Sequence, residues 1–389
     1  MPKKKNVYLY DEVKNKIIND TINIPAHTRV PTRMEMMAAY NVTRTTIEKA
    51  ISQLIGEGYL YSRDGSGTYI AERNNGQPSN GKNAIESWGV LIRNIMHDTY
   101  PEIFRGIEDF ANARNINVIL CNTDNDVEKQ GEYIEKLVES GVSGIIIVPA
   151  LGEYPGHESF RYLAENNVPF VFCVRKVENI KAPQVISNNF YGALIVTEHF
   201  VKLGYKRIAY AGPASYSVVE HRLQGYLAYL TMAGHTISND YIYIDGGDFD
   251  ADQEQVGRAA VKALFMKNTL KPDAFVCFND RIAQGVYWAL EEEGLKIGRD
   301  IGLAGYDDSS ICTAMPVKLT TVRYPKYETG WSASEILYGI INGEDFRDNH
   351  TVVLQPSLII RQSCGGGSME IETINKKYPQ SRQAEIITG

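Results

Sequence analysis

The feature that most constrains the fold is a repeated alternation of two sequence patterns between residues 88 and 363. Short apolar runs, such as 88–92 and 144–149, are followed by stretches in which apolar residues recur at helical spacing. Nearly continuous apolar strands of this kind are typical of parallel sheets that helices cover on both faces. Because the series begins again after Ile186, the pattern predicts an α/β architecture of two doubly wound parallel-sheet subdomains.

A polar stretch separates this large part from a small N-terminal one. Residues 74–83 contain no large apolar side chain, which is typical of a linker. We expect an N-terminal domain over 1–73, a linker over 74–87, a large domain over 88–363 and a flexible tail over 364–389. Within the large domain, the expected division gives 88–186 and 319–349 to subdomain one, and 187–318 and 350–363 to subdomain two. Ligands of such folds bind beyond the carboxyl ends of the strands, so a cleft between the subdomains is the expected pocket.

Composition and motifs argue against several classes of protein. No apolar run approaches the roughly 18 residues that cross a bilayer, and the polar start lacks the apolar core of a signal peptide. The five cysteines form no close pair, which favours core residues in a reducing cytoplasm. The sequence also lacks the common nucleophile, phosphate-loop, dinucleotide and zinc-hydrolase motifs. We therefore expect a cytoplasmic protein that is not an enzyme and has no cofactor or metal.

The first 73 residues have the pattern of a nucleic-acid reader. They carry 11 Lys and Arg against 8 Asp and Glu, whereas the whole chain has a net charge of -7. Thr32 and Glu35 have the spacing of a capping box and predict the start of a second helix. Thr43 can cap a third helix, which presents small polar and basic residues at its start. Two strands around the glycine-rich segment 62–67 follow, so the pattern predicts a winged helix-turn-helix that enters the major groove of DNA.

This module resembles the GntR family of bacterial winged-helix regulators. The matching segments are 31–32 before the second helix, 41–47 through the turn, 54–60 after the third helix and 65–70 in the wing. The resemblance implies that the start of the third helix and the wing touch DNA, through Arg44, Thr45, Thr46 and Gly65. We add Arg33, Thr43, Lys49 and Ser66 as candidate DNA-binding residues. Met34 and Glu48 depart from the family pattern, and Arg33 is the candidate to compensate for Met34.

Three polar clusters follow strands or begin helices in the large domain, at 220–226, 278–283 and 305–308. Together with 199–209 and 319–322, they resemble the effector-binding domain of the LacI family, which is similar to periplasmic sugar-binding proteins. The resemblance implies that Arg222, Asn279 and Asp307 bind the effector. Arginine donates hydrogen bonds, aspartate accepts them from paired hydroxyls, and asparagine does both, which suits a sugar. Tyr100, as a platform for the ring, and Arg175 complete the candidate effector site.

The two resemblances together imply a transcriptional repressor of carbohydrate-utilisation genes. Its partners would be double-stranded operator DNA, an arabinose-like monosaccharide between hinged subdomains, and a second copy in a homodimer. A nucleoside or nucleobase effector remains open, and a sugar-transport component or a fusion to an aminotransferase-like domain fits the sequence less well. The sequence identifies neither the sugar nor the operator, and it leaves open whether the ligand releases or promotes DNA binding.

Overall fold

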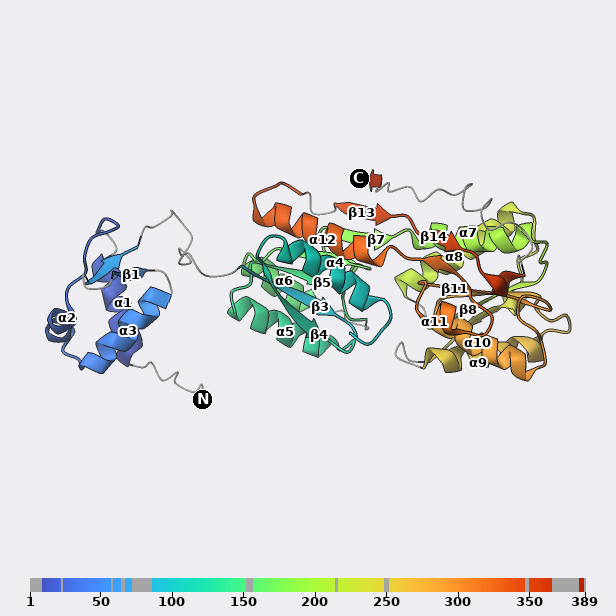
Figure 1. Cartoon of the computed structure of the whole chain (residues 1–389), viewed down its shortest axis with the longest axis horizontal. Coiled ribbons are helices and arrows are strands. Elements are labelled where there is room, and N and C mark those ends of the chain that lie inside the picture. Colours follow the sequence, from blue (N-terminus) through green and yellow to red (C-terminus); the bar gives the residue numbers. More distant parts are fainter. Residues whose placement is uncertain are drawn as a thin grey trace. The chain divides into compact units, whose positions relative to one another are not determined.

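The computed structural model describes residues 9–21, 24–56, 59–63, 67–71, 86–151, 157–213, 216–247, 252–346, 350–365 and 385–387. The chain divides into two compact units, Met1–Ile85 and Glu86–Gly389, and each is described by itself (Figure 1). None of the described helices is both long and apolar enough to span a bilayer. All five cysteines are free and buried, so these side chains belong to the core, as the sequence predicts.

The N-terminal unit is a winged helix-turn-helix, as the sequence predicts. Its elements are α1 (Leu9–Thr21), α2 (Arg33–Tyr40), α3 (Arg44–Gly56), β1 (Leu60–Arg63) and β2 (Gly67–Ile70). Thr32 and Glu35 form the expected capping box at the start of α2, and Asn41 ends that helix in a left-handed conformation with φ 52°. The apolar faces of α1, α2 and α3 share one core that includes Ile17, Met36 and Leu54. The strands β1 and β2 pair in an antiparallel hairpin.

The second unit consists of two lobes, each built on a twisted sheet. The first lobe has the strand order β15-β13-β7-β6-β5-β3-β4, in which all pairs are parallel except β13 with β15. Its elements are β3 (Ser87–Ile92), α4 (Tyr100–Asn112), β4 (Asn117–Asn122), α5 (Val127–Glu139), β5 (Gly144–Ile147), α6 (His157–Glu165), β6 (Phe170–Cys173), β7 (Gln184–Ser187), α12 (Lys326–Ile341), β13 (Thr351–Leu354) and β15 (Glu385–Ile387).

The strand pleat explains why the first lobe has helices on both faces. Along β5, Ile145 and Ile147 pack in the same cluster as α5 and α6, whereas Ile146 packs in the cluster that contains α4 and α12. Successive side chains of a strand point to opposite faces, so a strand that is apolar at every position needs a cover on both sides. Helices α4 and α12 lie side by side, as do α5 and α6 (Figure 1).

The second lobe has the strand order β14-β12-β11-β10-β8-β9, and only the β12–β14 pair is antiparallel. In this lobe α7 packs against α8, and α9 packs against α10. Its elements are α7 (Asn189–Lys202), β8 (Ile208–Gly212), α8 (Ser217–Met232), η1 (Asn239–Tyr241), β9 (Ile242–Ile244), α9 (Gln253–Lys267), β10 (Ala274–Cys277), α10 (Asp280–Glu292), β11 (Gly302–Tyr306), α11 (Ile311–Ala314), β12 (Thr320–Arg323), β14 (Ser357–Ile359) and η2 (Gln362–Cys364).

The expected subdomain boundaries need correction near the C-terminus. Strand β12 lies in the second lobe, although 319–349 was assigned to subdomain one, and β13 lies in the first lobe, although 350–363 was assigned to subdomain two. The reason is that the chain changes lobes after β7, after β12 and after β13, and it is back in the first sheet at β15. Each crossing joins apolar segments of similar composition, so hydrophobic pattern alone does not show which sheet a strand enters.

The tail also begins later than expected. Cys364 is fully buried and its sulfur lies 3.3 Å from Nε2 of His199, so this residue belongs to the second lobe. Near the end of the chain, β15 pairs with β13 at the edge of the first sheet. These residues therefore do not behave as a flexible tail. Residues 366–384 of the predicted tail lie outside the described part of the chain.

Glycines allow α9 and α10 to approach closely, and this contact gives a stability prediction. A Cβ atom on Gly285 would lie 1.9 Å from the carbonyl oxygen of Glu254, a backbone atom that cannot swing away. We expect Gly285→Ala to lower the free energy of unfolding by about 3 kcal/mol, the upper range for overpacking. Urea unfolding measures it. The control is Gly131→Ala in α5, where the nearest atom is 3.9 Å away and alanine favours the helix by up to about 1 kcal/mol. Equal stability of the two variants would contradict this packing.

Candidate functional site

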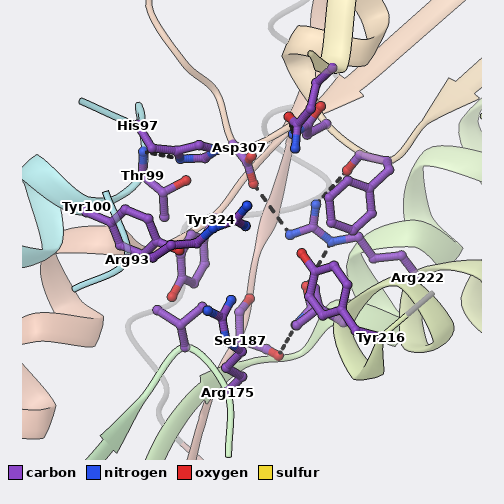
Figure 2. A pocket seen from close by; sticks show the side chains of 16 residues that line it. Arg93, His97, Thr99, Tyr100, Arg175, Ser187, Tyr216, Arg222, Asp307 and Tyr324 are labelled. Carbon is purple, nitrogen blue, oxygen red and sulfur yellow. Dashed lines mark hydrogen bonds and ion pairs between the residues drawn. The ribbon is translucent and has the colours of Figure 1, made fainter. Parts of the chain in front are cut away.

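A cavity lies between the two lobes, at the carboxyl ends of strands from both sheets (Figure 2). It encloses about 560 Å³ of space not filled by protein atoms, a volume that includes the solvent at its open mouth. The structure brings all five predicted effector residues to its wall, and their role in binding stays a prediction. These residues are Tyr100, Arg175, Arg222, Asn279 and Asp307.

Arg222 is the most constrained side chain of the cavity. It is 6 % exposed, and its Nη2 donates to Oδ1 of Asp307 at 3.4 Å. Its Nη1 donates to the carbonyl oxygen of Phe278 at 2.5 Å, and its Nε donates to Oδ1 of Asn189 at 2.9 Å. The guanidinium also lies 3.4 Å from the centre of the Tyr306 ring. Burial opposes its charge, but Asp307 and Tyr306 outweigh burial and raise the pKa of Arg222. The cavity therefore contains a fixed cation in one orientation.

Two adjacent aspartates after β11 have different tasks. Asp307 faces the cavity, with φ 103°, a backbone conformation that non-glycine residues seldom adopt. Asp308 accepts hydrogen bonds from Nε of Arg323 at 2.8 Å and from Nη2 of Arg361 at 2.6 Å. Burial raises the pKa of Asp308, but Arg361 and Arg323 outweigh it and hold the pKa below its ordinary value. Arg323 is the last residue of β12 and Arg361 follows β14. The two hydrogen bonds of Asp308 therefore connect the segment after β11 to both of these strands.

Asn279 lies at the cavity wall, but its side chain is already engaged. Its Oδ1 accepts from the backbone N–H of Ile282 at 3.0 Å and caps α10, and its Nδ2 donates to Oε1 of Gln253 at 2.5 Å. It is 3 % exposed. A ligand can use Asn279 only through the remaining hydrogen-bonding capacity of its amide.

Several residues that sequence reasoning did not single out also line the cavity. They come from the loop after β3, from the crossing after β7, and from the starts of α8 and α9. The crossing after β12 adds one more. They include Arg93, His97, Thr99, Ser187, Asn189, Tyr216, Gln253 and Tyr324. Position directly after an apolar strand was a usable signal for Arg93 and Tyr324. The others depend on how the lobes face each other, which local sequence does not show.

An ion pair connects the two lobes beside this cavity. Nε of Arg281, at the start of α10, lies 3.1 Å from Oδ2 of Asp98 in the loop after β3. The side chains are 47 % and 23 % exposed, so solvent screens the pair. The contact nevertheless ties a loop of the first lobe to a helix of the second, and it can form only while the lobes are close.

Asp280 makes the stability of the second lobe depend on pH. Burial, and then Asp307, raise the pKa of Asp280 from 3.8 to about 7. The protonated form therefore stabilises the fold fully below pH 3.8, and this contribution is lost as the pH rises through about 7. We expect wild type to lose up to about 1.4 kcal/mol per pH unit in this window, relative to Asp280→Asn. Asparagine can still bond the N–H of Ser309 and the hydroxyl of Thr321, which now meet Asp280. Urea unfolding of both proteins from pH 5 to 8 measures the difference, and parallel curves would contradict it.

The start of α3 presents most of the predicted DNA-binding residues on the surface of the N-terminal unit. Thr43, Arg44, Thr45 and Lys49 are exposed, and Thr46 is half-buried. The hydroxyls of Thr43 and Thr46 lie 2.9 Å apart. Gly65 and Ser66 lie outside the described residues. The apolar stripe of α3 faces the core, so its polar face is available to a duplex.

Arg33 and Arg44 have partners within the N-terminal unit. Nη1 of Arg33 donates to the hydroxyl of Thr68 in β2 at 2.6 Å, so this side chain braces α2 against the wing. Nε of Arg44 lies 2.8 Å from Oε1 of Glu48, one turn along the same helix, with both side chains largely exposed. Met34 is 80 % exposed. Arg33 can therefore compensate for Met34 in contacting DNA only if its hydrogen bond to Thr68 breaks.

Comparison with known proteins finds a match for each unit. Residues 7–70 match the bacterial regulatory proteins of the gntR family, and residues 197–364 match the periplasmic binding protein-like domain. An arabinose metabolism transcriptional repressor from Geobacillus stearothermophilus is 27% identical over 367 residues, or 93% of this chain and 99% of the repressor. A second one, from Halalkalibacterium halodurans, is 24% identical over 370 residues, or 93% of this chain and 97% of the repressor.

The solved structures agree with this fold. A LacI family transcriptional regulator from Enterococcus faecium, crystallised with bound ribose, is similar with a TM-score of 0.60 and 26% identity. The similarity covers 72% of this chain and 98% of that one. The two matched domains confirm the expected α/β domain after a winged helix-turn-helix. The relatives are regulators of transcription, which confirms the expectation of a protein that is not an enzyme.

Proposed function

Since the chain carries a gntR-type DNA-binding domain ahead of a periplasmic-binding-protein-like domain, we propose that it is a transcriptional repressor of carbohydrate-utilisation genes. A monosaccharide bound between the lobes controls its affinity for operator DNA. The names of the two arabinose repressors support an arabinose-like sugar as the first candidate. The repressor acts as a cytoplasmic homodimer on a two-fold symmetric operator, because paired readers match paired half-sites.

The observation that carries this proposal is the Arg222–Asp307 pair in the cavity wall. The carboxylate of Asp307 accepts hydrogen bonds from sugar hydroxyls, and the guanidinium of Arg222 donates them. Tyr100 and Tyr216 also line the cavity and supply apolar ring faces. A polyol needs this combination of paired donors and acceptors beside an aromatic wall.

The position of the cavity between lobes explains how a sugar changes the state of the protein. A ligand that contacts both walls favours the closed arrangement over the open one, as the Asp98–Arg281 pair does. If operator DNA prefers one arrangement, the sugar and the operator change each other's affinity reciprocally. A coupling of about 1–3 kcal/mol changes operator affinity roughly 5–150-fold.

A thermal-shift screen with monosaccharides, followed by gel shifts, tests the proposal. A sugar at 100 times its dissociation constant should add about 2.7 kcal/mol to the stability of the folded state. The same sugar should change binding to a duplex that the full-length protein selects from a random pool. Stabilisation by nucleosides or nucleobases alone would instead support the alternative effector class. A chain that selects no duplex would contradict the repressor.

A further inference from the structure

Arg175 is a buried cation without a counter-ion in the described part of the chain. It follows β6, lines the cavity and is 4 % exposed. Its Nε and Nη2 both donate to the carbonyl oxygen of Pro149, at 2.8 and 2.5 Å, and no carboxylate of the described residues forms an ion pair with it. A carbonyl dipole offsets only part of the cost of burying a full charge.

The charges that line the cavity do not balance. Asp307 is the only carboxylate among the described lining residues, and it already meets Arg222. Burial lowers the pKa of His97 below 6.5, so its ring is neutral at pH 7 and the arginines carry the positive charge. A neutral ligand bound in the cavity would bury this excess positive charge without neutralising it.

Two hydroxyl donors lie at the cavity wall near Arg175. Figure 2 shows Arg175 and Ser187 at the end of the cavity away from Asp307, and Tyr324 between Asp307 and Arg175. The hydroxyl oxygens of Ser187 and Tyr324 are buried and form no hydrogen bond of ordinary geometry in the described structure, and their neighbouring hydroxyls are those of Tyr306 and Thr329. Burial raises the pKa of Tyr324 well above its ordinary value, so its hydroxyl keeps its proton and can donate. A cation with two hydroxyl donors beside it is a typical donor set for an anionic oxygen.

The backbone beside Arg175 is strained. Val174 has φ 72°, and a β-branched residue in the left-handed region is a clear outlier. Strain of this kind persists where the surrounding structure enforces it, and it is frequent at ligand-binding positions. The fold therefore maintains both a strained residue and a buried charge at this point of the cavity wall.

We infer that the effector is a monosaccharide that carries an anionic group, a carboxylate or a phosphate, and that Arg175 binds this group. The inference rests on the proposed function, because it places the sugar hydroxyls at Asp307 and Arg222 on the opposite wall. Ser187 and Tyr324 donate to the remaining oxygens of the anionic group. The ligand thus supplies the negative charge that the cavity lacks.

Matched pairs of ligands test this inference on the full-length protein. Isothermal titration compares L-arabinose with L-arabinonate, D-galactose with D-galacturonate, and D-arabinose with D-arabinose 5-phosphate. We expect the charged member of at least one pair to bind at least tenfold more tightly than its neutral partner. The pair that shows the preference distinguishes a carboxylate from a phosphate. Sugar binding without a preference for the charged member in any pair would overturn the inference and leave the proposed function standing, whereas a failure of every sugar, charged or neutral, would contradict both.

The variant Arg175→Gln identifies the residue responsible. It should reduce the charged-to-neutral preference to within twofold, because most of the loss of affinity falls on the charged member of the pair. It should also unfold at the same temperature as ligand-free wild type or at a higher one, since it removes an uncompensated buried charge. Arg175→Lys keeps the charge and should keep part of the preference. A preference that survives in Arg175→Gln would overturn the assignment of the anionic group to Arg175.

Discussion

Replacing Asp307 with asparagine is expected to lower the free energy of unfolding by about 3 kcal/mol and to weaken effector binding at least tenfold. The change leaves the guanidinium of Arg222 buried without a carboxylate partner. Removing one member of a buried ion pair typically costs about 3–5 kcal/mol. The lower end applies here because Arg222 keeps its bonds to Phe278 and Asn189. Hydrogen bonds that involve a charged group contribute about 1.5–3 kcal/mol, which sets the expected loss of affinity.

Asparagine is the informative replacement because it separates charge from backbone strain. It tolerates the positive φ of position 307 better than alanine does. Urea unfolding gives the loss of stability, and titration with the sugar that stabilises wild type gives the loss of binding. The control is Asp240→Asn, which removes an exposed partner of Lys267 and should leave the urea midpoint unchanged. A variant Asp307→Asn that is as stable as wild type and binds the sugar equally well would contradict the role of this pair.

Sequence reasoning located the cavity wall because of the geometry of parallel sheets. Polar residues directly after apolar strands meet at one edge, and Arg175, Asn279 and Asp307 all follow strands of the predicted series. Arg222 differs, since it lies within α8, and only the family resemblance pointed to it. Hydrophobic pattern thus predicts which residues lie at strand ends. It does not predict which helix side chains reach the site, because that depends on tertiary packing.

What the sequence did not predict depends on the crossings between the lobes. Ser187 and Tyr324 reach the cavity because the chain leaves one sheet and enters the other at these positions. The same crossings caused the wrong assignment of β12 and β13. Arg33 shows a second limit, since its bond to Thr68 joins residues 35 positions apart. Helix and strand periodicity does not predict contacts between residues this far apart in the sequence.

Replacing Arg44 with alanine is expected to weaken binding to the selected duplex roughly 10–100-fold. The Arg44 side chain is 74% exposed at the start of α3, and a well-placed arginine contact to a base contributes about 1–3 kcal/mol. If Arg44 binds phosphate instead, the loss should be similar on every sequence, and the salt dependence should fall by about one unit. Fluorescence anisotropy at several salt concentrations, on selected and random duplexes, distinguishes the two. Unchanged affinity on both duplexes would contradict a role for Arg44.

The ion pair between Arg44 and Glu48 predicts an effect of opposite sign for the neighbouring residue. Glu48→Gln removes the partner that competes with DNA for the guanidinium, together with a negative charge on the face that meets the phosphates. The exposed pair contributes little to the fold, so the variant should unfold at the same temperature as wild type. We therefore expect Glu48→Gln to bind DNA several-fold more tightly, and Arg44→Ala with Glu48→Gln to lose most of this gain. Weaker binding by Glu48→Gln would instead show that Glu48 orients Arg44 for its contact, because a competitor and a positioning partner act in opposite directions on the same arginine.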